Sequence, residues 1–279
     1  MYFSMLLPRT IKHLFLLLLF GFLFLPSKNS FAQEYHELEH DLVLDGVIAG
    51  TGLVFTALAE SVLKKPLAKE TCGWCSPPEF DLGVRNALKW DNTKLPLTLS
   101  DAIAASEFFG TLGALALIDH NKNGGLDLIS QDFILMTEAV ATTMVFTNII
   151  KWTVGRQRPF AHFNGDELAA SENNLSFFSG HSSLSASVAA ASTTLALLRG
   201  YDEVWWILGI TGTMALTTAY FRVAGDAHYF SDVISGILIG TTFGVGIPLL
   251  FHGRKGAKPS KQTQQIKLGL SSVNFQLTF

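Results

Sequence analysis

Six apolar stretches of helical length follow one another through the chain, and polar turns separate them. Alanine, leucine and methionine dominate these stretches, which lack the strict alternation of half-buried strands. Clusters of glycine, proline and asparagine mark the turns. The pattern predicts an all-α fold, a bundle of about six helices joined by short connections. The expected helices cover residues 43–62, 99–118, 128–151, 183–199, 203–222 and 231–251.

Acidic residues interrupt the first three apolar stretches, whereas the last two stretches are apolar enough to cross a bilayer. A carboxylate is costly in lipid unless it faces the interior of a bundle. The bundle is therefore expected to be membrane-embedded or membrane-associated, and a packed soluble bundle is the alternative. The interrupting acids are Asp45, Glu60, Asp101, Glu107, Asp132 and Glu138.

The N-terminus has the pattern of an export signal. Arg9 and Lys12 precede a 12-residue apolar run, which is shorter than the about 20 residues that a spanning helix needs. Small residues at Ser30 and Ala32 fit a cleavage site before Gln33. We therefore expect an exported protein with a signal peptide over residues 1–32.

Composition narrows the function. The net charge of −3 offers no basic surface for nucleic acid, and 279 residues suit one domain with a sizeable core. Cys72 and Cys75 are the two cysteines, and in an exported protein such a pair predicts a disulfide in a loop. A metal site at this pair would need two further ligands.

Most of the positive charge and histidine of the second half falls in three short stretches at helix ends. They are KWTVGRQRP at 151–159, FSGHSS at 178–183 and FRVAGDAHYFSD at 221–232. If the helices alternate in direction, the three stretches meet at one end of the bundle. Taken singly, each group is compatible with an interfacial lysine, a helix cap or a satisfied core histidine. Taken together in a charge-poor chain, they indicate a binding site.

The residue types of this cluster suit a phosphate group. Lys151, Arg158 and Arg222 supply permanent cations, and the planar fork of arginine fits phosphate oxygens. Ser179 and Gly180 stand just before an expected helix, whose first N–H groups favour an anion. His228 and Asp232 are four residues apart, which places them on one face if the last helix begins that early.

The order and spacing of these residues resembles the type 2 phosphatidic acid phosphatase (PAP2) superfamily, which includes non-specific acid phosphatases and vanadium haloperoxidases. The motif consists of Lys151, six residues, Arg158-Pro159; Ser179-Gly180-His181; and Arg222, five residues, His228, three residues, Asp232. The resemblance covers roughly residues 98–251. Phe178 and Phe221 stand where the family usually has proline and serine.

The resemblance implies a two-step phosphoryl transfer. His228 would attack phosphorus and form a phosphohistidine, and Asp232 would orient its ring. His181 would protonate the leaving oxygen and then activate water. The phosphoryl oxygens would be held by the remaining motif residues, Lys151, Arg158, Ser179, Gly180 and Arg222. Because these fixed cations take the place of a metal ion, no metal and no cofactor is expected.

We therefore expect a phosphatase acting on a phosphomonoester or pyrophosphate bond, with a lipid phosphate or polyprenyl pyrophosphate favoured. A soluble periplasmic non-specific acid phosphatase, a vanadium-dependent haloperoxidase and a non-enzymatic anion-binding membrane protein are the alternatives. The expected division is 1–32 signal peptide, 33–97 N-terminal helix and CxxC loop, 98–251 phosphatase core, and 252–279 basic linker and tail.

Membrane topology sets two expectations against each other. A cleaved signal places Gln33 in the periplasm, whereas Arg254 and Lys255 after the last helix favour the cytoplasmic side there. Both hold if the stretch 43–62 does not cross the bilayer. We therefore expect an inner-membrane protein with a periplasmic site and a first helix that packs on the bundle or lies in the interface.

Weaker patterns receive ordinary interpretations. HELEH at residues 36–40 matches a zinc-protease string but lacks an established helix, and DHNKNGGLD at 119–127 lacks the final acidic ligand of a calcium loop. We interpret them as a linker and a turn. The alternating positions of residues 266–279 predict an edge strand or docking tail.

Overall fold

The computed structural model describes residues 35–122, 124–164 and 173–256. Within these ranges the secondary structure is helical apart from isolated bridges, so the predicted all-α class is confirmed. The predicted signal peptide and the alternating tail lie outside the described residues.

The six expected helices are present, and several are longer than the apolar pattern indicated. The first, α2 (Leu42–Leu58), continues through a π-helical turn η2 (Ala59–Leu63) into α3 (Lys64–Leu67). The others are α5 (Lys94–Asn121), α6 (Gly125–Val154), α9 (Gly180–Arg199), α10 (Val204–Ala224) and α11 (Phe230–Phe251). Helix α5 begins at Lys94, five residues before the start expected for the second helix.

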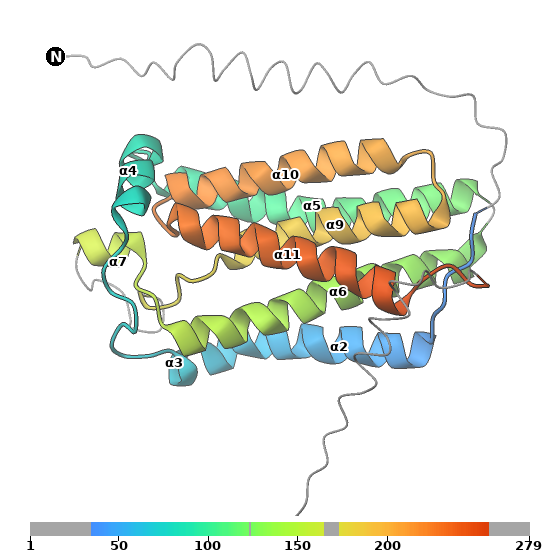
Figure 1. Ribbon diagram of the computed structural model, residues 1–279, viewed down its shortest axis with the longest axis horizontal. Helices are drawn as coiled ribbons and strands as arrows, with labels where there is room; N and C mark the ends of the chain where they lie inside the picture. The colour runs from blue at the N-terminus through green and yellow to red at the C-terminus, as the bar shows by residue number, and fades with distance from the viewer. Residues whose placement is uncertain (1–34, 123, 165–172, 257–279) are drawn as a thin grey trace, which may run out of the picture. The chain divides into compact units, whose positions relative to one another are not determined.

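Two short helices were not predicted from the apolar pattern. They are α4 (Glu79–Leu88) and α7 (Pro159–Asn164). Both lie at the end of the bundle where α6 and α10 finish and where α9 and α11 begin (Figure 1), which we call the α4 end. The opposite end, which holds the bridge between Leu38 and Arg254, is called the Arg254 end.

Small residues bring α9 and α11 into close contact at the centre of the bundle. Gly236, Gly240 and Gly244 recur every four residues and so share one face of α11. A Cβ added at Gly240 would lie 2.2 Å from the carbonyl oxygen of Ser183, and one at Gly244 would lie 2.7 Å from that of Ser187. The glycine row therefore permits a backbone approach that any larger residue would prevent. This approach sets the position of α9, whose first residues enter the charged cluster.

The first helix runs the full length of the bundle beside α6 and in the same direction (Figure 1). At its start, Leu38 pairs with Arg254, and Glu39 donates its backbone N–H to Gly253 at 2.8 Å. Beyond its end, Lys69 donates to the carbonyl of Thr153 at 2.6 Å, and Gly73 donates to that of Gly155 at 2.8 Å. Its two ends therefore lie at opposite ends of the bundle.

Five helices of the described chain are long and apolar enough to cross a membrane, and the first helix is among them. They are residues 42–67, α5, α6, α10 and α11. The expectation that residues 43–62 do not cross is therefore not supported. The long helix of the described residues that lies outside this set is α9, whose serines and alanines are largely buried against its neighbours.

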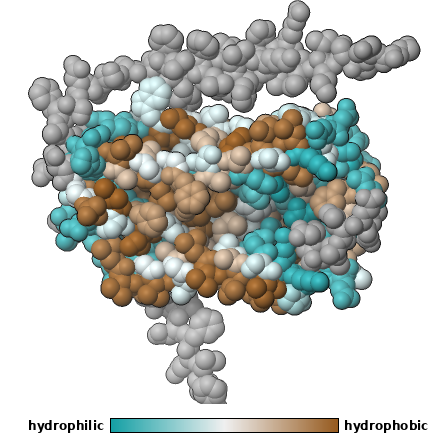
Figure 2. Space-filling model, turned by 180° about the vertical axis from the view of Figure 1, so that it is seen from behind, coloured by the Kyte–Doolittle hydropathy of each residue, from teal (hydrophilic) through white to brown (hydrophobic). Residues whose placement is uncertain are grey.

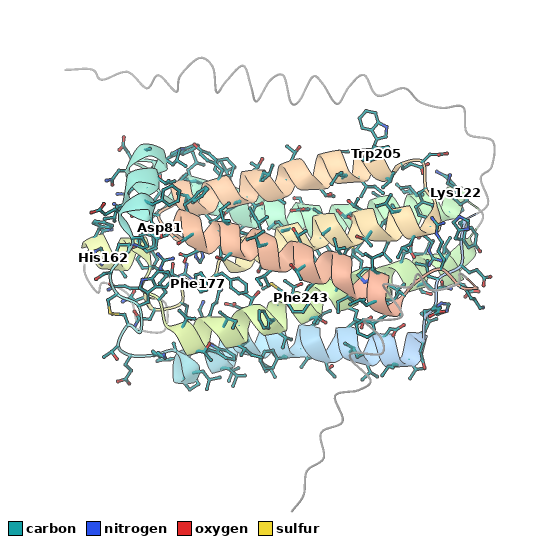
Figure 3. The ribbon with its side chains drawn as sticks, in the orientation of Figure 1. Asp81, Lys122, His162, Phe177, Trp205 and Phe243 are labelled. Atoms are coloured by element: carbon teal, nitrogen blue, oxygen red, sulfur yellow. A yellow bond between two sulfur atoms is a disulfide. The ribbon has the colours of Figure 1, made fainter. Side chains whose placement is uncertain are left out.

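Apolar side chains cover the outside of the bundle. In Figure 2, hydrophobic residues dominate the middle of the visible face, and hydrophilic residues gather toward its two ends. Figure 3 shows Asp81, His162 and Phe177 at the α4 end and Lys122 near the opposite end. An apolar belt of this kind fits a lipid surrounding, because monomeric soluble proteins rarely expose large apolar patches. Its large exposed members include Val54, Val62, Phe109, Leu117, Ile210, Leu216 and Leu238.

The loop after α3 is fastened to the α4 end. Cys72 and Cys75 are joined by a disulfide bond. Between them, Trp74 bridges to Arg156 and accepts a backbone hydrogen bond from Gln157 at 3.1 Å. The cysteine loop therefore forms part of the wall around the charged cluster.

Candidate active site

The three charged stretches meet at the α4 end of the bundle, as the alternating-helix argument predicts. Lys151 lies in the last turn of α6, His181 in the first turn of α9, and Arg222 in the last turn of α10. Arg158 follows α6, and its Nη1 lies 3.3 Å from Nε2 of His228. Residues separated by up to 77 positions therefore line one site.

His228 is fully enclosed, with 1% of its surface exposed. Its Nδ1 lies 2.8 Å from the backbone carbonyl oxygen of Ser176, which can only accept, so Nδ1 carries the proton. The other nitrogen, Nε2, then bears the lone pair on the side of Arg158. Burial, together with the charges of Arg158, Arg222 and Lys151, holds the pKa of His228 well below its ordinary value. The ring is therefore neutral at pH 7, as a nitrogen nucleophile must be.

The expectation that Asp232 orients this ring directly needs correction. The nearest carboxylate oxygen of Asp232 lies 3.8 Å from Nδ1 of His228, too far for a hydrogen bond. The α11 helix begins at Phe230, so His228 lies before the helix and does not share a helical face with Asp232. Asp232 instead accepts from the Ser176 hydroxyl at 2.6 Å and from the Tyr229 backbone N–H at 2.9 Å. It acts on His228 through Ser176.

Arg156 is the site residue whose importance the sequence pattern concealed. Its guanidinium is 1% exposed and donates to Asp232, to Asp81 at 2.7 Å and to the Ser231 hydroxyl at 2.8 Å. The ring of Trp74 lies 3.8 Å from the guanidinium carbon. Arg156 therefore binds structural carboxylates inside the protein, in contrast to Arg158, which faces His228.

The short helix α4 supplies two further buried charges. Asp81 accepts from the Ser231 backbone N–H at 2.9 Å and from its hydroxyl at 2.6 Å. Arg85 forms a two-pronged pair with Asp226, at 2.5 and 2.7 Å. Asp226 has a positive φ of 60° in the turn that leads to His228. Helix α4 thus fixes the turn between α10 and α11 from outside.

Gly180 allows Lys151 to reach the start of α9. A Cβ at Gly180 would lie 2.9 Å from Nζ of Lys151, so a side chain there would displace the ammonium group. Ser179 caps the helix, since its hydroxyl accepts from the Ser182 backbone N–H at 3.4 Å and lies 2.9 Å from the Ser182 hydroxyl. The first N–H groups of a helix have no partner within it. This corner therefore combines an ammonium group with the N–H groups at the start of α9, which suits an anion.

Asp101 joins two of the predicted site residues and was not itself predicted. One carboxylate oxygen lies 3.0 Å from Nε2 of His181 and 2.9 Å from Nη1 of Arg222. Arg222 also donates to the Ser100 hydroxyl at 3.1 Å. Burial lowers the pKa of His181, whereas the Asp101 hydrogen bond and charge raise it and Arg222 lowers it. Asp101 therefore favours the protonated form of this histidine.

Phe178 and Phe221, the two residues that depart from the family pattern, pack against other aromatic rings. Phe178 is 2% exposed and packs on Phe146, with ring centres 6.3 Å apart. Phe221 meets the edge of the Trp90 ring at 5.7 Å. Aromatic packing therefore replaces the proline and the serine at these positions.

The arrangement is chemically suited to a tetrahedral oxyanion beside a neutral imidazole. Three cations and the start of α9 face the same space, and a second histidine lies beside Arg222. Among the described residues, the grouping of His, Asp and Glu close enough for a metal ion is Asp45, Glu138 and His252, near the Arg254 end. Within the described residues, the charged cluster at the α4 end does not offer such a grouping.

The comparison with known families agrees with this geometry. A family model described as the PAP2 superfamily matches residues 133–255. The resemblance to the PAP2 superfamily that the motif indicated is confirmed over these residues. The match includes every motif residue from Lys151 to Asp232 and leaves Asp101 and α4 outside.

A solved structure that matches this chain is the crystal structure of the first transmembrane PAP2 type phosphatidylglycerolphosphate phosphatase from Bacillus subtilis. The two are 18% identical, and the match covers 86% of this chain and 93% of that chain, with a TM-score of 0.37. A likeness this distant does not bear on the substrate.

Proposed function

We propose that this PAP2 protein is a phosphatase that hydrolyses a lipid phosphate or a polyprenyl pyrophosphate. The observation that carries the proposal is the buried, neutral His228, whose lone pair at Nε2 faces the space between Arg158, Lys151 and Arg222. A nucleophile enclosed by cations is suited to a substrate whose charge those cations neutralise.

In the first step, the Nε2 lone pair of His228 attacks phosphorus, and the bond between phosphorus and the leaving oxygen breaks. His181 gives its proton to that oxygen. In the second step, His181 takes a proton from water, the hydroxide attacks phosphorus, and the phosphorus–nitrogen bond breaks. Inorganic phosphate leaves, and both histidines return to their first state.

The cations hold the phosphoryl oxygens through both steps. Arg158 lies beside the attacking nitrogen, and Arg222 lies on the side of His181, so the two arginines flank the path between nucleophile and acid. Lys151 lies beside Gly180 at the start of α9. Phosphoryl transfer depends mainly on such positioning and charge stabilisation.

A lipid substrate is favoured because the site lies at one end of an apolar, membrane-type bundle. Five described helices can cross a bilayer, and their outward residues are apolar. A phosphate carried at the lipid–water boundary would reach this end without leaving the membrane. The soluble acid phosphatase and haloperoxidase alternatives do not need this belt.

A substrate comparison tests the function. The purified chain should hydrolyse phosphatidic acid or a polyprenyl pyrophosphate faster than p-nitrophenyl phosphate. The His228→Ala variant should lose activity on the order of 10³-fold or more, because removal of a nucleophile disables the chemical steps. His120→Ala, at the exposed end of α5, is the matched control and should retain activity. Halide oxidation with vanadate and no phosphate release would reject the proposal.

Asp101→Asn should change the pH dependence of turnover. The first step needs protonated His181, and the Asp101 carboxylate raises the pKa of that histidine. Its removal lowers the pKa further, so the alkaline limb of the rate profile should move to lower pH. Since the Asp101 side chain is 60% exposed, we expect a shift of roughly one pH unit.

The exposed Asp91→Asn variant is the control for this measurement and should leave the limb in place. A second check is Asp101→Asn in a His181→Gln background, where no limb should remain to be shifted. An unchanged limb in the single variant, or a movement to higher pH, would show that Asp101 does not govern His181.

We further propose that the α4 end faces the periplasm. The disulfide of Cys72 and Cys75 lies at this end, and Arg254 and Lys255 lie at the other. Because the first helix starts beside Arg254, this orientation puts residue 35 at the cytoplasmic end. If the first helix crosses the membrane, a cleaved export signal would instead put residue 35 in the periplasm. A periplasmic site and a cleaved export signal are therefore incompatible in that case.

Single-cysteine labelling decides the orientation. In intact spheroplasts, an impermeant thiol reagent should label His162→Cys at the α4 end and should label Lys255→Cys only after lysis. The native cysteines are joined in a disulfide and should not react. Labelling of Lys255→Cys alone in intact cells would place the site in the cytoplasm and support the signal instead. Carbonate should leave the protein in the membrane.

A further inference from the structure

Three side chains of metal-ligand type converge near the Arg254 end, away from the charged cluster at the α4 end. They are Asp45 in the first turn of α2, Glu138 in α6 and His252 just after α11. Each offers one ligand atom, and these atoms lie within 4.8 Å of one another. The exposed fraction is 5% for both acids and 2% for the histidine. The three come from separate elements and are enclosed together.

The charges of this group do not balance. Nε2 of His252 lies 2.9 Å from Oε2 of Glu138, and Nδ1 lies 3.2 Å from the carbonyl oxygen of Glu39 and 4.0 Å from Oδ2 of Asp45. The ion pairs recorded for Asp45 and Glu138 within the described residues all go to His252. Two buried carboxylates therefore share at most one positive charge. Burying an uncompensated carboxylate is costly, so a second positive charge would stabilise this group.

We propose that Asp45, Glu138 and His252 form a binding site for one divalent transition-metal ion, such as Zn²⁺. Two carboxylates and an imidazole suit this ion, and three protein ligands leave a fourth position for water. Nδ1 keeps its hydrogen bond to Glu39, which orients the ring as metal-ligand histidines are usually oriented. Nε2 releases its proton to solvent and gives its lone pair to the metal. The proposal does not rest on the phosphatase function.

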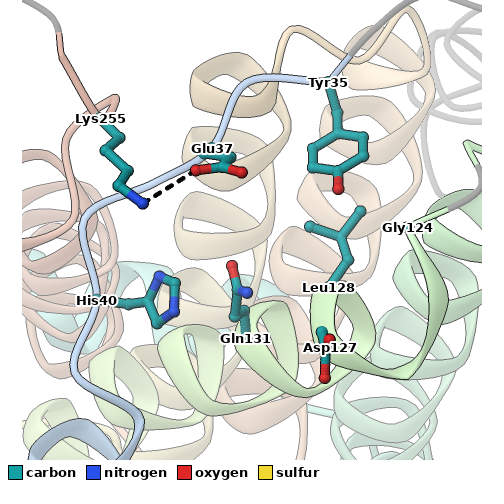
Figure 4. A pocket seen from close by; sticks show the side chains of 8 residues that line it. All are labelled: Tyr35, Glu37, His40, Gly124, Asp127, Leu128, Gln131 and Lys255. Carbon is teal, nitrogen blue, oxygen red and sulfur yellow. Dashed lines mark hydrogen bonds and ion pairs between the residues drawn. The ribbon is translucent and has the colours of Figure 1, made fainter.

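A cavity lies beside the chain segment that contacts His252. The cavity has a volume of about 250 Å³ and is lined by polar residues that include Glu37, His40 and Gln131 (Figure 4). Glu37 and His40 stand on either side of Glu39 in the chain segment whose carbonyl binds His252. The ion pair of Lys255 with Glu37, at 3.1 Å, lies across the same cavity. The cavity thus brings solvent to the segment whose Glu39 carbonyl contacts His252.

A bound ion would fasten α2 to the rest of the bundle. Asp45 is held in place because Oδ2 accepts the Asp41 backbone N–H at 2.8 Å. Glu138 and His252 fix α6 and the end of α11 to the same point. Since the ion binds only the folded arrangement, it should raise the stability of the protein.

The test uses the purified full chain, stripped with EDTA and titrated with Zn²⁺, Mn²⁺ or Mg²⁺. We expect one Zn²⁺ per chain after dialysis, a rise in Tm of roughly 5 °C at saturation, and a smaller effect of Mg²⁺. Glu138→Gln preserves the side-chain volume and should abolish both the retained ion and the Tm rise. His252→Gln should do the same.

His40→Gln is the matched control, because His40 lines the neighbouring cavity without belonging to the group. It should bind Zn²⁺ as the wild type does. Zn²⁺ retention that survives Glu138→Gln, or that disappears with His40→Gln instead, would overturn the assignment. Absence of both retention and stabilisation in the wild type would show that the group is a protonated ion-pair cluster only. The readouts are metal content and Tm, so failure here leaves the phosphatase assay unaffected.

Discussion

The buried guanidinium of Arg156 is the interaction on which the charged end of this bundle depends. It binds two carboxylates that are themselves inaccessible to solvent, Asp81 from α4 and Asp232 from α11. Removal of one partner from such a group leaves an uncompensated buried charge, which typically costs about 3–5 kcal/mol. The backbone of Arg156 also accepts from the Ser176 N–H at 2.9 Å. Because Ser176 in turn accepts from His228, one residue links the outer helix, the core helix and the imidazole.

This linkage explains how one end of an apolar bundle can hold several cations near each other. Arg156 and Arg85 are neutralised by protein carboxylates, whereas Lys151, Arg158 and Arg222 surround the space in front of His228. The first pair holds the site together, and the other three face the space in which an anion would bind. Arg222 also pairs with the exposed Asp101. Burial, together with the charge of these three cations, lowers the pKa of His228 and keeps the imidazole neutral, so the cations that would attract a phosphate also help to prepare the nucleophile. Asp101 limits this effect at His181, which has to carry a proton in the proposed first step.

The sequence predicted the helices and the members of the motif because both are encoded locally. Apolar period and turn residues identify a long helix, and fixed spacing identifies Lys151, Arg158 and the other motif residues. Helix α4 was missed because it is short and its important residues, Asp81 and Arg85, are polar at buried positions. Its partners Ser231 and Asp226 lie more than 140 residues away. No local pattern signals such pairs.

Long-range contacts also explain two other differences from the sequence-based expectations, one for the first helix and one for the orientation of His228. Asp45 counted as a defect in a spanning segment, yet in the structure it lies within 4.0 Å of His252, 207 residues later in the chain. The spacing of His228 and Asp232 indicated a direct contact, which would require a helix that starts earlier than Phe230. A backbone carbonyl, that of Ser176, holds the ring instead, and a carbonyl has no sequence signature.

The central claim is that His228 becomes phosphorylated at Nε2 while Ser176 holds Nδ1. Rapid quenching of the enzyme during turnover of a ³²P-labelled substrate, followed by proteolysis and mass spectrometry under alkaline conditions, measures this directly. The account predicts acid-labile phosphate on the peptide that contains His228, attached to the nitrogen remote from the Cβ. Phosphate on the other ring nitrogen, or on a serine or aspartate, would contradict it.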